Sequence, residues 1–89
     1  MPALPTVIVP VFNAVASLDA CLASLSRTLP ANAVVMIADD ASTDPAVETL
    51  ARHWCDRSTF AASYVRRPVN LGFPANCNTA FAEAGRADV

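Results

Sequence analysis

Polar residues that could bind a ligand follow three apolar, β-branched segments of this 89-residue chain. Asn13 follows the first segment, the stretch 39–44 (DDASTD) follows the second, and the stretch 67–72 (RPVNLG) follows the third. The segments are predicted to be strands over Thr6–Phe12, Ala33–Ala38 and Ala61–Val65. If these strands are parallel, the polar stretches converge at one edge of the sheet, where open α/β sheets bind their ligands.

The acidic stretch has the alternating oxygen ligands of a calcium loop, because Asp40, Ser42 and Asp44 are two residues apart. Pro45, however, occupies the position where such a loop needs glycine, and Ala51 occupies the position of its closing glutamate. These two residues exclude a calcium loop of that type.

Two other interpretations of the acidic stretch are a dinucleotide site and a purely structural role. An acid at the end of a second strand could hold a ribose, but the turn after the first strand has no glycine, so the G-x-G-x-x-G cradle is missing. Alternatively, Asp44 is only a helix cap, and Asp39 and Asp40 are solvated charges near a helix N-terminus. The stretch by itself does not decide between binding and structure.

Amphipathic patterns predict a helix after each strand. The first helix is predicted to have Ser17 as its N-cap, and the second starts at the cap and proline pair Asp44-Pro45. The third has Pro74 at its first position and ends at Gly85. The expected apolar stripes are Leu18, Cys21, Leu22 and Leu25 in the first, Val47, Leu50, Ala51 and Trp54 in the second, and Phe73, Cys77, Phe81 and Ala84 in the third.

The β-α-β-α-β-α order predicts a three-layer α/β fold with a parallel sheet and helices on its faces. Because a parallel unit is normally closed by another strand, we predict residues 1–89 to be the incomplete N-terminal part of a larger domain. With strand order 3-2-1, the free edge of Thr6–Phe12 would be unpaired. We therefore expect a homo-oligomer, formed through that edge or through the uncovered face of the sheet.

The composition excludes several classes of function. Six basic residues against eight acidic ones give a net charge of −2, which disfavours nucleic-acid binding. Apolar runs of about six residues are much shorter than the roughly 20 of a membrane span, and the N-terminus lacks a secretory signal, so we expect a cytoplasmic protein. Cys21, Cys55 and Cys77 are odd in number and widely spaced, so we expect buried or half-buried thiols rather than disulfides.

Three smaller features are expected to be structural. Arg66 and Arg67 are predicted to be a solvated pair at a strand end rather than a phosphate site. Trp54 lies on a helical stripe, which indicates a core residue. His53 and Cys55 lack a second pair of ligands, so they do not predict a metal site.

Three motifs lie in order at the strand-to-helix junctions: VIVPVFN over residues 7–13, ADDASTD over 38–44 and NLGFPANCN over 70–78. Together they resemble the first part of the family 2 glycosyltransferases, inverting enzymes of the nucleotide-diphospho-sugar transferase (GT-A, Rossmann-like) fold. The third motif begins with NLGF at residues 70–73, and this form of the motif is similar to that of rhamnosyltransferase-like members of the family. The resemblance implies transfer of a sugar from a nucleotide donor, a UDP- or dTDP-sugar, to a glycan or other acceptor in cell-wall or polysaccharide biosynthesis.

The resemblance also implies roles for individual residues of a nucleotide site. Pro10, Val11 and Phe12 would form a wall for the base, although the family more often has tyrosine in place of Phe12. Asp40 would accept a hydrogen bond from the imide N–H of a pyrimidine, a donor that costs roughly 1–3 kcal/mol if left unpaired. Asp39 would be structural. The remaining residues of the implied site are Asn13, Ser42, Asn70, Gly72 and Asn76.

Those remaining residues have different implied tasks. Ser42 would fix the acidic loop by local hydrogen bonds. Asn70 and Gly72 match the loop that closes over the nucleotide, where glycine permits a close approach of the backbone. Asn76 stands where many relatives place a basic residue that could face the diphosphate. Asn13, Asp40 and Asn70 are expected to open onto one pyrimidine-sized crevice.

The family's catalytic residues are expected beyond Val89. They comprise the D-x-D segment, which holds a divalent metal (Mg or Mn) against the sugar diphosphate, and the general base; the acceptor-binding half also lies there. We therefore expect these 89 residues to bind no metal and to be inactive alone, as part of a parent enzyme whose membrane association is open. The rival interpretation is a non-catalytic nucleotide-binding or interaction module.

Overall fold

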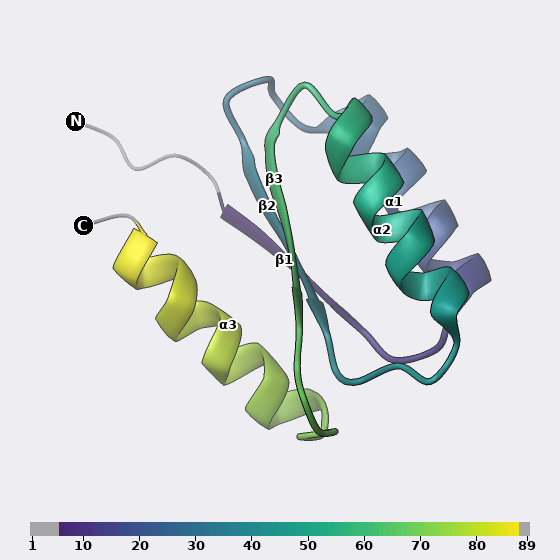
Figure 1. The fold of residues 1–89 in the computed structure, drawn as a ribbon. Helices are drawn as coiled ribbons and strands as arrows, with labels where there is room; N and C mark the ends of the chain where they lie inside the picture. Colours follow the sequence, from purple (N-terminus) through teal and green to yellow (C-terminus); the bar gives the residue numbers. More distant parts are fainter. Residues whose placement is uncertain (1–5, 88–89) are drawn as a thin grey trace.

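Three parallel strands alternate with three helices in the structure, a computed structural model that describes residues 6–87 (Figure 1). The elements are β1 (Thr6–Val11), α1 (Val15–Thr28), β2 (Val34–Asp39), α2 (Pro45–Arg57), β3 (Ala61–Arg66) and α3 (Phe73–Ala87). This order confirms the predicted α/β fold. Each strand matches its predicted segment to within one residue at either end.

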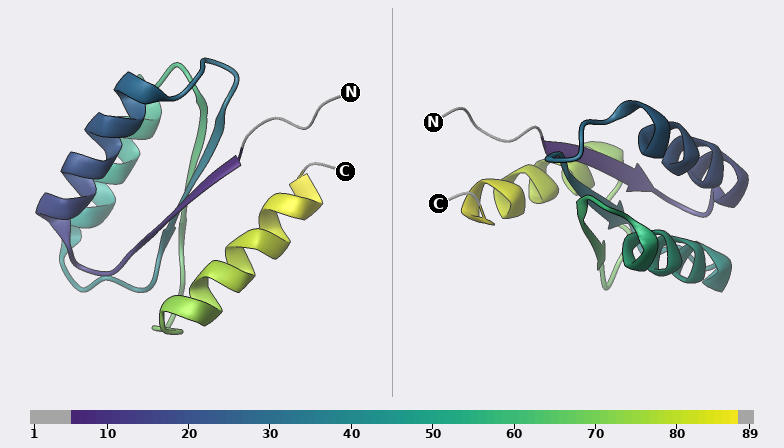
Figure 2. Two further views of the ribbon diagram at one scale, coloured as in Figure 1. Left: turned by 180° about the vertical axis from the view of Figure 1, so that it is seen from behind. Right: turned by 90° about the horizontal axis from the view of Figure 1, so that it is seen from above.

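The sheet has the order β1-β2-β3, as predicted, with β2 in the middle. Both pairings are parallel, and their registers place Val11 beside Asp39 and Asp39 beside Arg66. All three strands therefore end at the same edge of the sheet. Helices α1 and α2 cover one face and α3 covers the other, where it packs on β1 and β2 (Figure 2).

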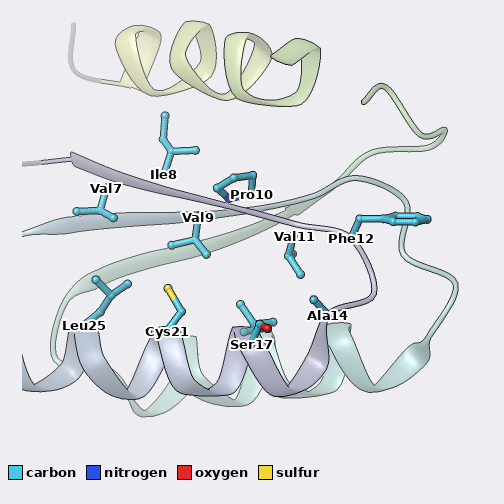
Figure 3. A pocket seen from close by; sticks show the side chains of 11 residues that line it. Val7, Ile8, Val9, Pro10, Val11, Phe12, Ala14, Ser17, Cys21 and Leu25 are labelled. Atoms are coloured by element: carbon cyan, nitrogen blue, oxygen red, sulfur yellow. The ribbon is translucent and has the colours of Figure 1, made fainter. Parts of the chain in front are cut away.

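The core lies between the sheet and the α1–α2 layer. Alternate strand residues point into it because side chains on a strand alternate between the two faces. Figure 3 shows this alternation in β1, where Ile8 and Pro10 point toward α3 and Val9 and Val11 point toward α1. The buried core residues are Val9, Val11, Leu18, Leu22, Val35, Ile37, Val47 and Ala51. Burying each of the larger ones contributes about 1.5–3 kcal/mol.

Helix α1 starts earlier than predicted, and Ser17 is not its cap. The N-cap is Ala14, whose side chain cannot accept a hydrogen bond. The backbone explains the difference, because Asn13 has a positive φ of 61° and turns the chain directly from β1 into the helix. Within this turn, the Ala14 amide donates to the Phe12 carbonyl at 2.8 Å. A sequence pattern of preferred caps does not detect such a turn.

Helix α3 buries Ala84 of the predicted stripe, but the prediction is wrong for the two phenylalanines of that stripe. Asn76, Ala80 and Ala84 are buried against the sheet, whereas Phe73 and Phe81 are exposed. The stripe of small residues allows the helix to pack closely on β1 and β2, and Asn76 is drawn in by hydrogen bonds to buried partners. The helix also begins at Phe73, one residue before the predicted Pro74.

Within residues 6–87, strand β1 has no neighbour on its outer side. A groove of about 340 Å³ lies along this edge between β1 and α1, and no charged side chain lines it (Figure 3). Cys21 lines the groove and is exposed, so the prediction that all three cysteines are buried or half-buried is wrong for this one. Self-association through the β1 edge stays a prediction.

Helix α2 has the predicted cap, and this cap is testable. The Asp44 carboxylate accepts a hydrogen bond from the Ala46 amide at 2.9 Å, and Pro45 follows as the first helical residue. We expect Asp44→Ala to lower the free energy of unfolding by about 1 kcal/mol in urea titrations. Asp44→Asn is the matched control, because asparagine caps a helix about as well as aspartate. An equal loss in both variants would contradict the capping role.

Candidate functional site

Three loops meet at the carboxyl ends of the strands, at the bottom of Figure 1. They are residues 12–14 after β1, residues 40–44 after β2 and residues 67–72 after β3. Side chains from the first two loops form hydrogen bonds that join each loop to its neighbour. The predicted convergence of the polar stretches is therefore present in the fold.

Asn13 joins the first loop to the second. Its side-chain oxygen accepts hydrogen bonds from the amides of Thr43 and Asp44, both at 2.9 Å. Its own amide donates to the Ser42 hydroxyl at 2.9 Å. Asparagine suits this position because it tolerates the left-handed backbone and carries an acceptor that reaches the neighbouring loop.

Asp40 joins the second loop to the third. One carboxylate oxygen accepts a hydrogen bond from the Leu71 amide at 2.7 Å, and the other accepts one from the Gly72 amide at 2.8 Å. The residue is 4% exposed, and these charge-assisted bonds offset the cost of burying its charge. Only a carboxylate has two acceptor oxygens for this task, since an amide offers one acceptor and one donor group.

In the third loop, Asn70 and Gly72 both form hydrogen bonds to Asp40. The Asn70 side-chain amide donates to the Asp40 carbonyl at 3.1 Å. Gly72 has a φ of +86°, a backbone conformation that residues with an L side chain rarely adopt and only with strain. The Gly72 carbonyl accepts a hydrogen bond from the backbone amide of Asn76 at 2.9 Å. This is the first hydrogen bond of α3, so the helix begins directly after the turn.

Asp39 points to the opposite face of the sheet from Asp40 and has a structural role. One carboxylate oxygen accepts a hydrogen bond from the Ser42 amide at 2.9 Å, and the other accepts one from the Tyr64 hydroxyl. Burial and this hydrogen bond to a carboxylate both raise the pKa of Tyr64 well above its usual value. The Arg52 guanidinium also lies over the Tyr64 ring, 5.0 Å from its centre.

Arg67 and Asn76 form a buried pair beneath the third loop. The Arg67 Nε donates to the Asn76 side-chain oxygen at 2.9 Å, and its Nη1 and Nη2 contact the Glu83 carboxylate at 3.0 and 2.8 Å. The side-chain NH₂ group of Asn76 donates to the Ala38 backbone carbonyl at 2.9 Å. Arg67 is therefore a buried anchor between β3 and α3, and the prediction of a solvated arginine pair is wrong for it.

A small pocket opens where the ends of β1 and β2 meet the start of α3. Its volume is about 90 Å³, and its lining residues are Pro10, Val11, Phe12, Asp40, Phe73 and Asn76. All but Phe73 belong to the predicted nucleotide site. The sequence predicts Phe73 as part of the apolar stripe of the third helix instead, because a phenylalanine at helical spacing is an ambiguous signal. Phe73 directly follows Gly72, which belongs to the loop expected to close over a nucleotide. This neighbouring position is the sequence feature that could have identified Phe73 as a pocket residue.

The other predicted residues, Asn13, Ser42, Asn70 and Gly72, hold the loops together around this pocket. Asn13 and Ser42 bond to each other and brace the acidic loop, while Asn70 and Gly72 bond to Asp40. Asn76 is 1% exposed and has both ends of its side-chain amide occupied by protein partners. The ligand-binding roles of all these residues stay predictions.

The described residues do not fit a metal centre. No group of three or more histidine, cysteine or acidic side chains among residues 6–87 could hold a metal ion. The oxygens of Asp39 and Asp40 accept hydrogen bonds from the protein instead.

The match to a protein family covers the three loops and the pocket. Residues 6–86 match the family model of glycosyl transferase family 2. The chain belongs to this family. Comparisons with curated proteins and with solved structures gave no match. The family membership confirms the predicted resemblance and supports a glycosyltransferase function, with a nucleotide-sugar donor and an acceptor in general terms. The similarity to rhamnosyltransferase-like members stays a prediction.

Loss of one acceptor oxygen at Asp40 should loosen the third loop. In Asp40→Asn, either the Leu71 or the Gly72 amide faces an NH₂ group instead of an acceptor, so we expect the free energy of unfolding to fall by about 1–3 kcal/mol. Urea unfolding measures this change. Asp19→Asn removes the same charge from an exposed position on α1 and should change stability by less than about 0.5 kcal/mol. Equal effects of the two substitutions would show that charge, not bonding geometry, matters at Asp40.

Tyr64 is the chain's one tyrosine, so its ionisation can be followed by tyrosinate absorbance. The pKa of Tyr64 is raised in the folded state and is about 10 in the unfolded chain. The stability that this difference contributes is complete below about pH 10 and is lost as the pH rises through the folded-state pKa. We expect the folded chain to ionise at clearly higher pH than the chain in urea. Above pH 10, Tyr64→Phe should lose stability less steeply than the unsubstituted protein. Coincident titration curves in the two states would contradict the partly buried hydrogen bond from Tyr64 to Asp39.

Proposed function

We propose that this chain is the nucleotide-binding part of an inverting family 2 glycosyltransferase that uses a UDP- or dTDP-sugar. The observation that carries the proposal is the pocket lined by Phe12 and Asp40, at the strand ends of a chain that matches this family over residues 6–86. In this function the pocket receives the base of the donor. The sugar diphosphate extends away from it toward the acceptor.

The chemistry of Asp40 supports a base with an N–H donor. A carboxylate has about four acceptor sites, and the amides of Leu71 and Gly72 use two of them. The remaining lone pairs can accept the imide N–H of uracil or thymine. These backbone bonds also hold the carboxylate in one orientation before a ligand arrives, which reduces the entropy that binding would lose.

The size of the pocket favours one small ring. A volume of about 90 Å³ corresponds to about three water molecules, which is much less than the roughly 300 Å³ or more of a site that encloses a whole ligand. The pocket therefore suits the edge of a pyrimidine, with the ribose and diphosphate outside it. A purine has a second ring, which disfavours it in so small a pocket. Adenine also lacks a ring N–H that could donate to Asp40, whereas guanine has one, so the expected discrimination against guanine rests on size alone.

We further propose that the catalytic parts lie outside these 89 residues. This proposal rests on Asp39, whose two carboxylate oxygens accept hydrogen bonds from the Ser42 amide and the Tyr64 hydroxyl, and on the lack of a ligand cluster within residues 6–87. The divalent metal, general base and acceptor site would then be supplied by further chain, and the fragment alone would bind without transferring sugar. Rhamnose transfer and a role in polysaccharide biosynthesis remain the expected specialisation.

The proposed location is the cytoplasm. Cys21, Cys55 and Cys77 are all free, which is typical of a reducing compartment. Within residues 6–87, no helix combines the length and the apolar character needed to cross a membrane.

Saturation-transfer NMR with UDP, dTDP and GDP tests the proposed function directly. We expect UDP or dTDP to receive saturation mainly on the protons of the base, because the base enters the pocket, and GDP to receive little. Incubation with UDP-sugar, manganese and a glycan acceptor should give no transfer. Equal binding of all three nucleotides through their phosphates would contradict recognition of the base. Measurable sugar transfer would contradict the proposal that these 89 residues are inactive alone.

A further inference from the structure

Phe73 is an exposed aromatic residue that the folding of the chain does not explain. Its side chain is 68% exposed, although it is the first residue of α3 and the helix buries Asn76, Ala80 and Ala84 instead. Phenylalanine offers 150–250 Å² of apolar surface, and exposing most of it forgoes a large stabilisation. A residue of this kind beside a pocket is a candidate for ligand contact.

The position of Phe73 is fixed by the same bonds that hold the third loop. The amides of Leu71 and Gly72 donate to Asp40, and the Asn76 amide donates to the Gly72 carbonyl. The backbone is therefore tied down on both sides of Phe73. Its ring lines the pocket together with Phe12, which is 49% exposed.

The two phenylalanine rings are not stacked on each other. Among the described residues, the aromatic pair in contact is Trp54 with Phe60, on the other side of the sheet. Neither Phe12 nor Phe73 is therefore paired with another described aromatic ring, and both side chains are exposed to a large extent. Stacking on the faces of aromatic rings is how proteins commonly hold nucleobases without reading their edges.

We propose that Phe73 is a binding residue for the nucleobase, which its ring stacks on from the α3 side while Phe12 supplies the wall on the β1 side. This inference rests on the proposed function, because it assigns a second aromatic contact to the same pocket. Asp40 then accepts a hydrogen bond from the imide N–H at the edge of the base. The two phenylalanines contribute affinity by contacting the faces of the base. The nucleoside diphosphate would bind weakly if either ring were lost.

The test compares Phe73→Leu with Phe81→Leu in the full 89-residue chain, with UDP and dTDP as the ligands. Phe81 is the matched control, because it lies on the same helix, is 66% exposed and does not line the pocket. We expect Phe73→Leu to weaken binding of the nucleotide that the unsubstituted chain prefers by about tenfold. Phe81→Leu should bind as the unsubstituted chain does, and Phe73→Tyr should retain the affinity because it keeps the ring.

The NMR spectrum of the bound nucleotide separates stacking from a general loss of structure. A base that lies on aromatic faces has its ring protons shifted upfield, and this shift should shrink in Phe73→Leu while the unfolding midpoint stays near that of the unsubstituted chain. Unchanged affinity and unchanged shifts in Phe73→Leu would overturn the role of Phe73 and leave the proposed function standing. If the unsubstituted chain bound neither UDP nor dTDP, the proposed function would fail, and the role of Phe73 with it.

Discussion

The structure of the site depends on one buried carboxylate. Asp40 accepts hydrogen bonds from the amides of Leu71 and Gly72, one on each oxygen, while its own amide donates to the Val11 carbonyl at 2.9 Å. The residue thereby connects the ends of β1 and β2 with the start of α3. Without the two carboxylate bonds, the third loop would keep one polar contact with the second loop among the described residues, the hydrogen bond from the Asn70 side chain to the Asp40 carbonyl. The exposed phenylalanine at the start of α3 would then be held less firmly. The cost of burying the charge is offset only while both amides remain in place.

The adjacent acids Asp39 and Asp40 have different partners, because successive residues along an extended strand point to opposite faces of the sheet. Asp39 lies on the α1–α2 side, where Tyr64 and the Ser42 amide bind it. Asp40 lies on the α3 side, where the pocket opens. Ala41, just after them, has a φ of 63°, which is unfavourable for a residue with a side chain. Hydrogen bonds on both sides of Ala41 hold this strained turn, as is common near binding sites.

The sequence predicted the fold well because its strongest signals are local. β-branched runs located the strands, and the Asp44-Pro45 pair located the start of α2. The start of α1 could not be predicted, since it depends on the left-handed backbone of Asn13 and its bonds to a loop about thirty residues away. Most of the buried face of α3 was also missed, because Asn76 is buried by long-range bonds to Arg67 and Ala38. The residues that line the pocket all lie within the three motifs, but which phenylalanine of helix α3 lies beside the pocket depends on tertiary packing.

Asn13 and Asp40 join the three loops into one unit through the backbone amides of Thr43, Asp44, Leu71 and Gly72. Native-state hydrogen exchange of these four amides is the decisive experiment. We expect all four to be protected and to open together, with one shared free energy of opening. Exchange of the Leu71 and Gly72 amides at the rate of an unprotected loop, while the Thr43 and Asp44 amides stay protected, would contradict the joining of the three loops into one unit.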